Sequence, residues 1–190
     1  MSRVRRRMTG PVVTGAVALV LAAAGFGLYW FQPWKLWTDA TVDESAPSAV
    51  APPPTAPPTV DPSAAATPAT PAAPRTVATG SLISHEHRTS GTVRVLRLAD
   101  GSHVLRLENL DTSNGPDLKV WLTDAPVREG KAGWHVFDDG AYVGLGDLKG
   151  NKGDQNYPLP AGIDPAEYTS VSIWCDRFDV SFGAAPLKKV

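Results

Sequence analysis

The sequence predicts an all-β domain, either an antiparallel β-sandwich or a small barrel, preceded by one transmembrane helix and a disordered linker rich in Pro and Ala. Three observations support this prediction. The chain has an uncharged apolar run near its beginning, a Pro-rich run without aromatic residues after it, and short β-rich runs between Gly, Pro and Asn turns in the remainder. We therefore expect a basic cytoplasmic head (1–10), a transmembrane anchor (11–32), a juxtamembrane segment and linker (33–76) and an extracytoplasmic β domain (77–190).

The anchor is long enough to cross a bilayer. No charged side chain occurs from Met8 to Trp34, and about 20 apolar residues at ~1.5 Å per residue span a hydrocarbon layer of ~30 Å. Four Arg residues precede the run, and Trp, Tyr and Lys cluster after it. This pattern predicts a single-pass protein of the cell membrane with a cytoplasmic N-terminus and its C-terminal domain outside. The alternative is a cleavable signal peptide with a junction at Ala22–Ala24, which exports the same domain.

The linker is centred on residues 46–74, which are almost entirely Ala, Pro, Thr, Ser and Val. Such a segment buries too little apolar area to offset the entropy of ordering it. Proline keeps the backbone extended, so this segment is expected to act as a semi-rigid stalk that holds the β domain away from the membrane. A proline-rich ligand for another module is the weaker alternative, because no basic residue flanks a Pro-x-x-Pro core.

Alternating apolar residues and turn signals predict the strands of the β domain. Asp100-Gly101 lies between two β-rich runs, which is a strong hairpin signal. No long run with helical periodicity competes, so the anchor is the only helix expected. The expected strands are Ser81–Ile83, Thr92–Leu98, His103–Leu110, Leu118–Thr123, Tyr142–Leu148, a run from Tyr168 to Cys175, and Phe178–Phe182.

Charge and motifs argue against several functions. Twelve Lys and Arg side chains against fifteen Asp and Glu give residues 77–190 a net charge of −3, with no basic stripe, so nucleic acid is not an expected partner. The glycine-rich run 144–157 lacks the Gly-Lys-Ser/Thr ending of a phosphate-binding loop, and we expect it to make tight turns. No Gly-x-Ser-x-Gly or His-Glu-x-x-His motif supports a hydrolase.

Cys175 is the one cysteine of the chain, so an internal disulfide is excluded. It shares a strand face with Val171 and Ile173, and the apolar phase changes before Phe178, which predicts a bulge or tight bend at Asp176-Arg177. A thiol in an exported protein is exposed to oxidation, which favours a reactive or metal-binding role. A packed core cysteine and a partner for another chain stay open as alternatives.

Two of the four histidines, His85 and His87, are one residue apart, so an extended chain would place both imidazoles on one side. Two such histidines with a distant Cys suit a transition metal, although polar surface histidines give the same pattern. A redox metal is favoured over zinc, because no second Cys and no close carboxylate completes a tetrahedral set. Haem iron or copper, supplied from elsewhere, are the candidate cofactors.

Several longer stretches carry a family resemblance. They are His87–Val93, Leu105–Leu110, Thr112–Leu122, Leu145–Tyr157 and Val171–Gly183. Through these stretches, residues from about 80 to 187 resemble the DM13 domain, an extracellular β-rich module named for electron transfer. The resemblance implies that the redox cysteine of the family falls on Cys175 and its histidine on His87.

Two hypotheses of different class follow. The first is a membrane-tethered electron-transfer or thiol-redox domain that uses Cys175, assisted by His87, with a redox partner protein. The second is a non-catalytic binding or scaffold module of the cell envelope, in which Cys175 is a core residue. Its contact candidates are Trp121, Trp134 and Asp117, because Trp and polar loop residues suit binding surfaces.

Overall fold

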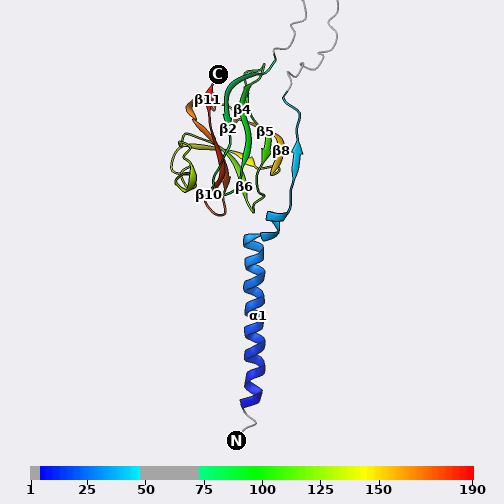
Figure 1. Cartoon of the computed structure of the whole chain (residues 1–190). Coiled ribbons are helices and arrows are strands. Elements are labelled where there is room, and N and C mark those ends of the chain that lie inside the picture. Colours follow the sequence, from blue (N-terminus) through cyan, green and yellow to red (C-terminus); the bar gives the residue numbers. More distant parts are fainter. Residues whose placement is uncertain (1–4, 48–72) are drawn as a thin grey trace, which may run out of the picture.

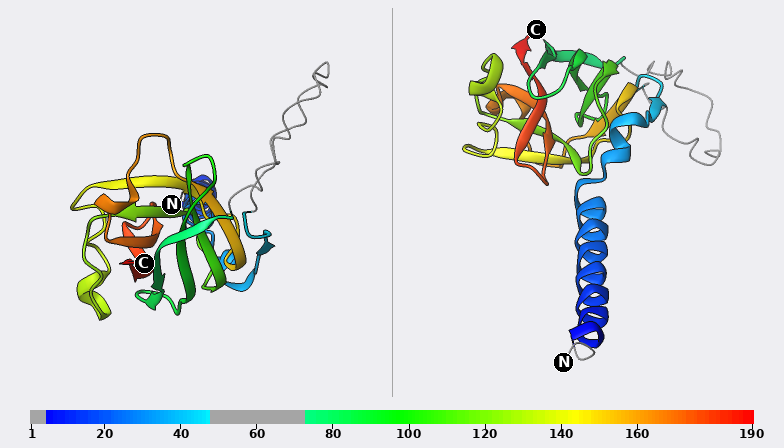
Figure 2. Two further views of the ribbon diagram at one scale, coloured as in Figure 1. Left: turned by 90° about the horizontal axis from the view of Figure 1, so that it is seen from above. Right: turned by 60° about the horizontal axis from the view of Figure 1, so that its bottom comes forward.

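A computed structural model of the protein describes residues 5–47 and 73–190, and every structural statement below refers to these residues. They form an N-terminal helix, α1 (Arg5–Phe31), and a β domain of two sheets (Figure 1). The helix projects from one end of the β domain, and the C-terminus lies at the opposite end (Figures 1 and 2).

The helix matches the predicted anchor in position and length. Its 22 residues from Gly10 to Phe31 are long and apolar enough to cross a membrane, and none of them is buried against the protein. A helix that exposes apolar side chains all round lacks the polar face of a helix that lies on a soluble domain. One such helix near the N-terminus fits a membrane tether, and a signal sequence has the same length and composition.

The first sheet has six strands in the order β1-β8-β5-β4-β2-β11. Its pairs are antiparallel, except that β1 runs parallel to β8. The predicted hairpin at Asp100-Gly101 joins β4 to β5, with Gly101 at φ 86°. The strands are β1 (Thr41–Asp43), β2 (Arg75–Ser81), β4 (Ser90–Arg97), β5 (His103–Asp111), β8 (Lys152–Pro158) and β11 (Lys188–Lys189).

The second sheet has five antiparallel strands in the order β3-β10-β9-β6-β7. The central strand β9 is buried along its whole length, because both of its faces are covered. The strands are β3 (Ile83–Ser84), β6 (Leu118–Thr123), β7 (Tyr142–Asp147), β9 (Ser170–Cys175) and β10 (Val180–Pro186).

The main core lies between the two sheets, so the fold is the predicted sandwich and not a closed barrel. Alternate residues of β5 and of β9 meet there, which is the packing that period-2 patterns predict. A second buried cluster covers the outer face of the second sheet, where the connection from β6 to β7 carries the short helix η2 (Gly130–Gly133). The main core includes Val93, Leu105, Leu107, Leu118, Val120, Tyr157, Val171, Ile173, Cys175, Val180 and Phe182.

The segment after the helix lies on the β domain. Residues 33–37 form the short helix η1 (Pro33–Trp37), and β1 then runs away from α1 along the edge of the first sheet (Figure 1). We call residues 38–45 the strap. The linker thus joins β1 to β2, and both of its ends lie on the β domain. It does not separate the helix from the domain, so the stalk prediction is wrong in this respect, and residues 48–72 themselves lie outside the described residues.

Three strand predictions differ from the structure. The edge strand expected at Ser81–Ile83 is two strands, β2 and β3, because the chain crosses from one sheet to the other at buried Leu82. The glycine-rich run 144–157 contains most of a further strand, β8. This strand was not predicted, because most of its residues are polar and do not alternate with apolar ones. The bend after Cys175 is a complete reversal, since residues 176–179 turn the chain from β9 into the antiparallel β10.

Candidate functional site

Cys175 ends β9 and lies in the main core. Its exposed fraction is 0 %, and its Cα partners across the sheet are Leu118 on β6 and Val180 on β10. The Val171, Ile173, Cys175 alternation places the thiol on the inner face of the second sheet, as the sequence predicts. The side chain is therefore packed among hydrocarbon groups and has no open path to solvent.

The surroundings of the thiol hold it protonated. Burial is the main cause that raises the pKa of Cys175 above its ordinary value. The negative charge of Asp117 acts in the same direction, whereas the backbone amides of Phe178, Arg177 and Asp117 oppose the rise. Reactive thiols need a depressed pKa and an opening. Cys175 has neither, so it is not a surface thiolate ready for disulfide exchange.

The turn after Cys175 contacts the C-terminal end of α1. The guanidinium of Arg177 donates a hydrogen bond to the carbonyl of Trp30 at 2.8 Å and lies 5.2 Å from the centroid of its ring. The ring of Phe178 stacks on that of Phe31, with centroids 5.6 Å apart. The Arg177 guanidinium thus binds the helix, and only the backbone amide of this residue acts on the thiol. Cys175 lies at the helix end of the β domain.

The two adjacent histidines point in different directions. Residues 85–87 form a bend and not an extended strand, so the prediction that both imidazoles share one side is wrong. The buried His85 ring contacts Ser181 Oγ through Nδ1 at 2.8 Å and the Arg128 carbonyl through Nε2 at 3.0 Å. The His87 ring lies against Phe182, with centroids 3.9 Å apart. Because residues 181 and 182 are consecutive in β10, the two rings lie on opposite faces of that strand.

His87 and Cys175 lie in the same region but are not directly bonded. Among the described residues no hydrogen bond joins them, and the link between them is Phe182, which contacts His87 and shares the main core with Cys175. Burial lowers the pKa of His87 below its ordinary value, and the nearby Glu86 carboxylate, 3.8 Å from Nε2, opposes this. The imidazole is therefore neutral at pH 7 and carries one N–H donor.

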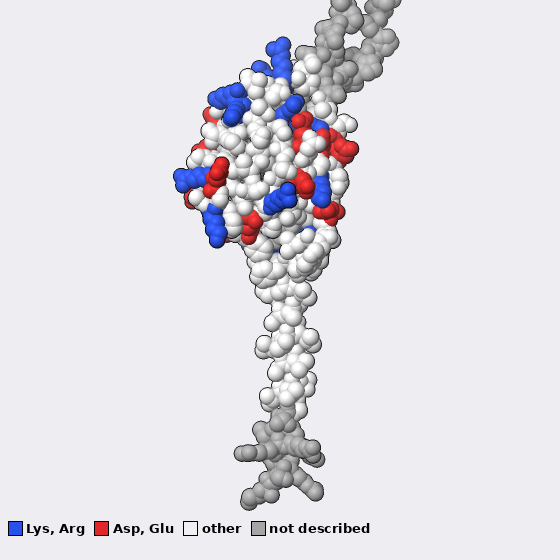
Figure 3. Space-filling view, in the orientation of Figure 1, with Lys and Arg blue, Asp and Glu red and all other residues white. Residues whose placement is uncertain are grey.

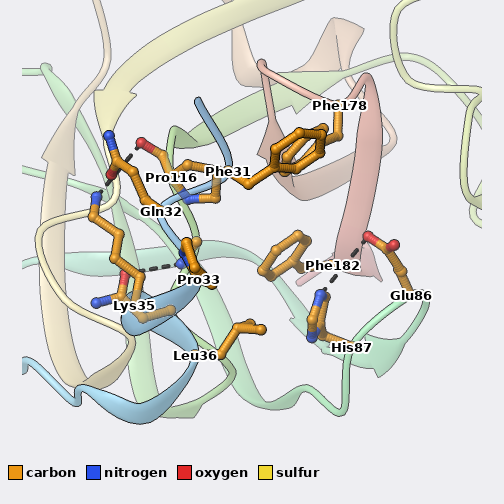
Figure 4. Close-up of a pocket in the computed structure, with 12 residues that line it drawn as sticks. Phe31, Gln32, Pro33, Lys35, Leu36, Glu86, His87, Pro116, Phe178 and Phe182 are labelled. Atoms are coloured by element: carbon orange, nitrogen blue, oxygen red, sulfur yellow. Dashed lines mark hydrogen bonds and ion pairs between the residues drawn. The ribbon is translucent and has the colours of Figure 1, made fainter. Parts of the chain in front are cut away.

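A pocket of about 390 Å³ lies between the C-terminal end of α1 and this part of the β domain (Figure 4). Its walls are mainly apolar. Phe182 and His87 come from the β domain, and Phe31 and Leu36 come from the end of the helix and from η1. Sequence reasoning missed this site, because the aromatic and Lys residues after the helix were interpreted as a membrane-interface belt alone. The remaining lining residues are Gln32, Pro33, Lys35, Glu86, Asn114, Gly115, Pro116 and Phe178.

The described residues do not assemble a metal site. No group of three or more His, Cys, Asp or Glu side chains comes together among them to hold an ion. The His85, His87 and Cys175 set considered for copper is dispersed over two faces of β10 and the core. These three side chains therefore do not form a copper ligand set in the described residues.

The three contact candidates of the scaffold hypothesis do not form one exposed surface. Trp121 is 7 % exposed and is stacked between Tyr142 and Trp174, with ring centroids 4.0 and 5.0 Å away. Trp134 is half-buried against the main core. Asp117 forms an ion pair of 2.9 Å with Lys119. Trp121 therefore acts in packing and is not available to a partner.

The described residues define an all-β sandwich module preceded by one apolar helix, which fits a membrane tether. A model of the family described as "Electron transfer DM13" matches residues 81–187, which is more than half of the chain. The chain belongs to the DM13 family. The match covers β3 to β10 and leaves out α1, η1, β1, β11 and all of β2 except Ser81. Neither the curated proteins nor the solved structures contain a match to this chain.

Proposed function

We propose that this protein is a membrane-tethered, extracytoplasmic electron-transfer module whose activity depends on Cys175 and His87. The family supports the electron-transfer role, and the apolar helix supports the tether. Four Arg residues before the apolar run, at positions 3, 5, 6 and 7, favour the orientation with the β domain outside the cell. The expected partner is a redox protein or another component of the cell envelope.

The position of both residues at the helix end of the β domain carries the proposal. Cys175 is three residues from Phe178, which stacks on Phe31 at the end of the helix. His87 lines the pocket at the same end. On the side that Figure 3 shows, the helix end of the β domain carries few charged side chains, in contrast to the rest of the domain. An apolar end next to a membrane helix suits exchange with a membrane-borne redox component.

The burial of Cys175 limits the kind of redox chemistry it supports. Disulfide exchange requires a thiolate that reaches a disulfide sulfur, and the thiol is sealed and protonated. We therefore propose that Cys175 does not itself exchange electrons. It packs in the core with Phe182, which contacts His87, and so affects the environment of the pocket. The group that exchanges electrons with a partner must be reachable from the pocket.

Voltammetry of the full chain, isolated from its own membrane, tests the proposal. Wild-type protein is expected to show a reversible couple whose potential is shifted in Cys175→Ala and in His87→Gln. Val180→Ala is the matched control, because it truncates a core residue that is the Cα partner of Cys175. This control should keep the wild-type couple. A folded Cys175→Ala protein with the wild-type couple would overturn the role of Cys175, and a wild-type chain without any couple would overturn electron transfer.

One observation favours the second candidate, a binding or scaffold module. Cys175 is as fully buried as Val171 and Ile173, as expected of a core residue. In that case Cys175→Ala lowers stability and leaves partner binding intact. Envelope proteins that co-purify with wild-type chain should then co-purify equally with Cys175→Ala, and neither chain should show a couple.

A further inference from the structure

The pocket lies at the level where the membrane interface is expected. The helix ends at Phe31, and Trp30, Trp34 and Trp37 around this end are 43 %, 48 % and 80 % exposed. Exposed Trp residues at the end of an apolar helix are typical of the boundary between hydrocarbon and headgroups. Phe31 and Leu36, next to these residues, form one wall of the pocket. A lipid-soluble molecule in the outer part of the bilayer therefore meets this pocket directly.

The pocket is lined by aromatic rings, and a side chain with hydrogen-bond donors lies on each of two sides. The Phe31 and Phe178 rings are stacked above it, and the Phe182 ring lies inside it (Figure 4). Lys35 lies on one side and His87 on the other, with Phe182 between them (Figure 4). The Lys35 ammonium is 3.5 Å from the Pro116 carbonyl, which is a weak bond for a group with three donors.

We propose that this pocket binds the ring of a lipid-soluble para-quinone, with Lys35 and His87 donating to its two carbonyl oxygens and its tail in the bilayer. The ligand class deepens the proposed function, on which it rests, by supplying the redox group that the described residues do not provide. A flat ring with an acceptor at each of two opposite edges matches donors on two sides of an aromatic cavity. The volume of about 390 Å³ lies within the usual range for small-molecule sites.

A lipid acyl chain is the competing occupant, and the polar groups distinguish the two. An acyl chain has no acceptor, so it leaves the Lys35 ammonium with only its weak bond to the Pro116 carbonyl. It leaves His87 with only the Glu86 carboxylate at 3.8 Å, which is unfavourable for two donors in an apolar pocket. A quinone ring satisfies both donors and keeps the aromatic contacts. The structure therefore favours an oxygenated ring over a saturated chain.

The test is photolabelling of the full chain in lipid nanodiscs with an azido derivative of decylbenzoquinone. We expect saturable labelling of peptides that contain Phe31–Leu36 or Glu86–His87. Excess decylbenzoquinone should abolish this labelling, and decylbenzene, which has the same tail without oxygens, should not. Because this comparison uses wild-type protein, its result does not depend on the folding of any variant.

Variants then locate the donors. Lys35→Met and His87→Leu should each weaken competition by decylbenzoquinone about tenfold or more, which is the effect of losing one hydrogen bond in an apolar site. Lys131→Met and His103→Leu are matched controls outside the pocket and should leave it unchanged. Labelling spread along α1 without saturation, or equal competition by decylbenzene, would overturn the proposal. Saturable quinone binding together with a couple that Cys175→Ala leaves unchanged would support the site and reject the proposed role of Cys175.

Discussion

Replacing Asn151 by Ala should release the strap from the β domain. Asn151 is 1 % exposed, and its side chain joins three parts of the molecule. Its Oδ1 accepts from the backbone amide of Ala40 at 2.7 Å, and its Nδ2 donates to Asp39 Oδ1 and to the Thr112 carbonyl, each at 2.8 Å. Two of these three bonds bind the strap.

The size of the effect follows from these contacts. Each strap bond contributes about 0.5–1.5 kcal/mol net, because water replaces it when the strap opens. Losing both lowers the free energy of strap opening by roughly 1–3 kcal/mol, which is about 5- to 150-fold in the opening equilibrium. The buried Thr112 carbonyl loses its partner in addition, which lowers the stability of the whole β domain by about 1–3 kcal/mol.

Hydrogen exchange of the Glu44 amide measures strap opening. This amide donates to the Asp154 carbonyl at 3.0 Å and belongs to the strap but does not contact Asn151. In Asn151→Ala its exchange should accelerate about 5- to 150-fold by local opening. Ser170→Ala is the control, because it removes one buried hydrogen bond to the Ala125 carbonyl in the second sheet and should leave Glu44 exchange unchanged. Equal exchange of Glu44 in wild type and Asn151→Ala would refute the reasoning.

Three further predictions concern the site. Cys175→Ser should lower the free energy of unfolding by about 1–3 kcal/mol in urea denaturation, because the serine hydroxyl enters an apolar core. In the wild-type protein, Cys175 should react with a thiol reagent only as fast as the protein unfolds. Burial lowers the pKa of His85 and of His87, so the unfolded chain binds more protons and the free energy of unfolding should fall as pH drops below about 6.5. Phe178→Ser should weaken the contact with α1 by about 0.5–1.5 kcal/mol, seen as greater mobility of a spin label on the β domain relative to the bilayer.

Each of these predictions has a contradicting result. Rapid labelling of Cys175 in folded protein would show an opening that the structure lacks. A free energy of unfolding that is constant between about pH 7.5 and about pH 5.5 would show that neither histidine is desolvated. Unchanged mobility in Phe178→Ser would show that the turn after Cys175 does not hold the helix, and Phe137→Leu, in the second cluster, serves as a control distant from that contact.

The sequence predicted the elements whose signal is local. The anchor is visible from its uncharged length, and the Asp100-Gly101 hairpin from turn chemistry. The inward position of Cys175 follows from its phase with Val171 and Ile173. By contrast, the His85 and His87 pair was misjudged, because an unseen bend rotates one ring relative to the other. The strand β8 was missed, because its polar residues bind the strap and close turns instead of filling the core.

Composition and periodicity alone therefore predicted an apolar helix, a Pro-rich linker and an all-β sandwich or small barrel. They also placed Cys175 on one strand face with Val171 and Ile173, and left open whether it is a core or a reactive residue. Only the tertiary structure decided that the strap pairs with β8, that Arg177 binds the helix, and that Phe31, Lys35 and His87 enclose one pocket. The physical reason is that alternation and hydropathy depend on neighbours in the chain. A pocket between residues more than 50 positions apart depends on which strands pair and on which segments pack against the outer faces of the sheets. A pattern of neighbouring residues does not predict either of these.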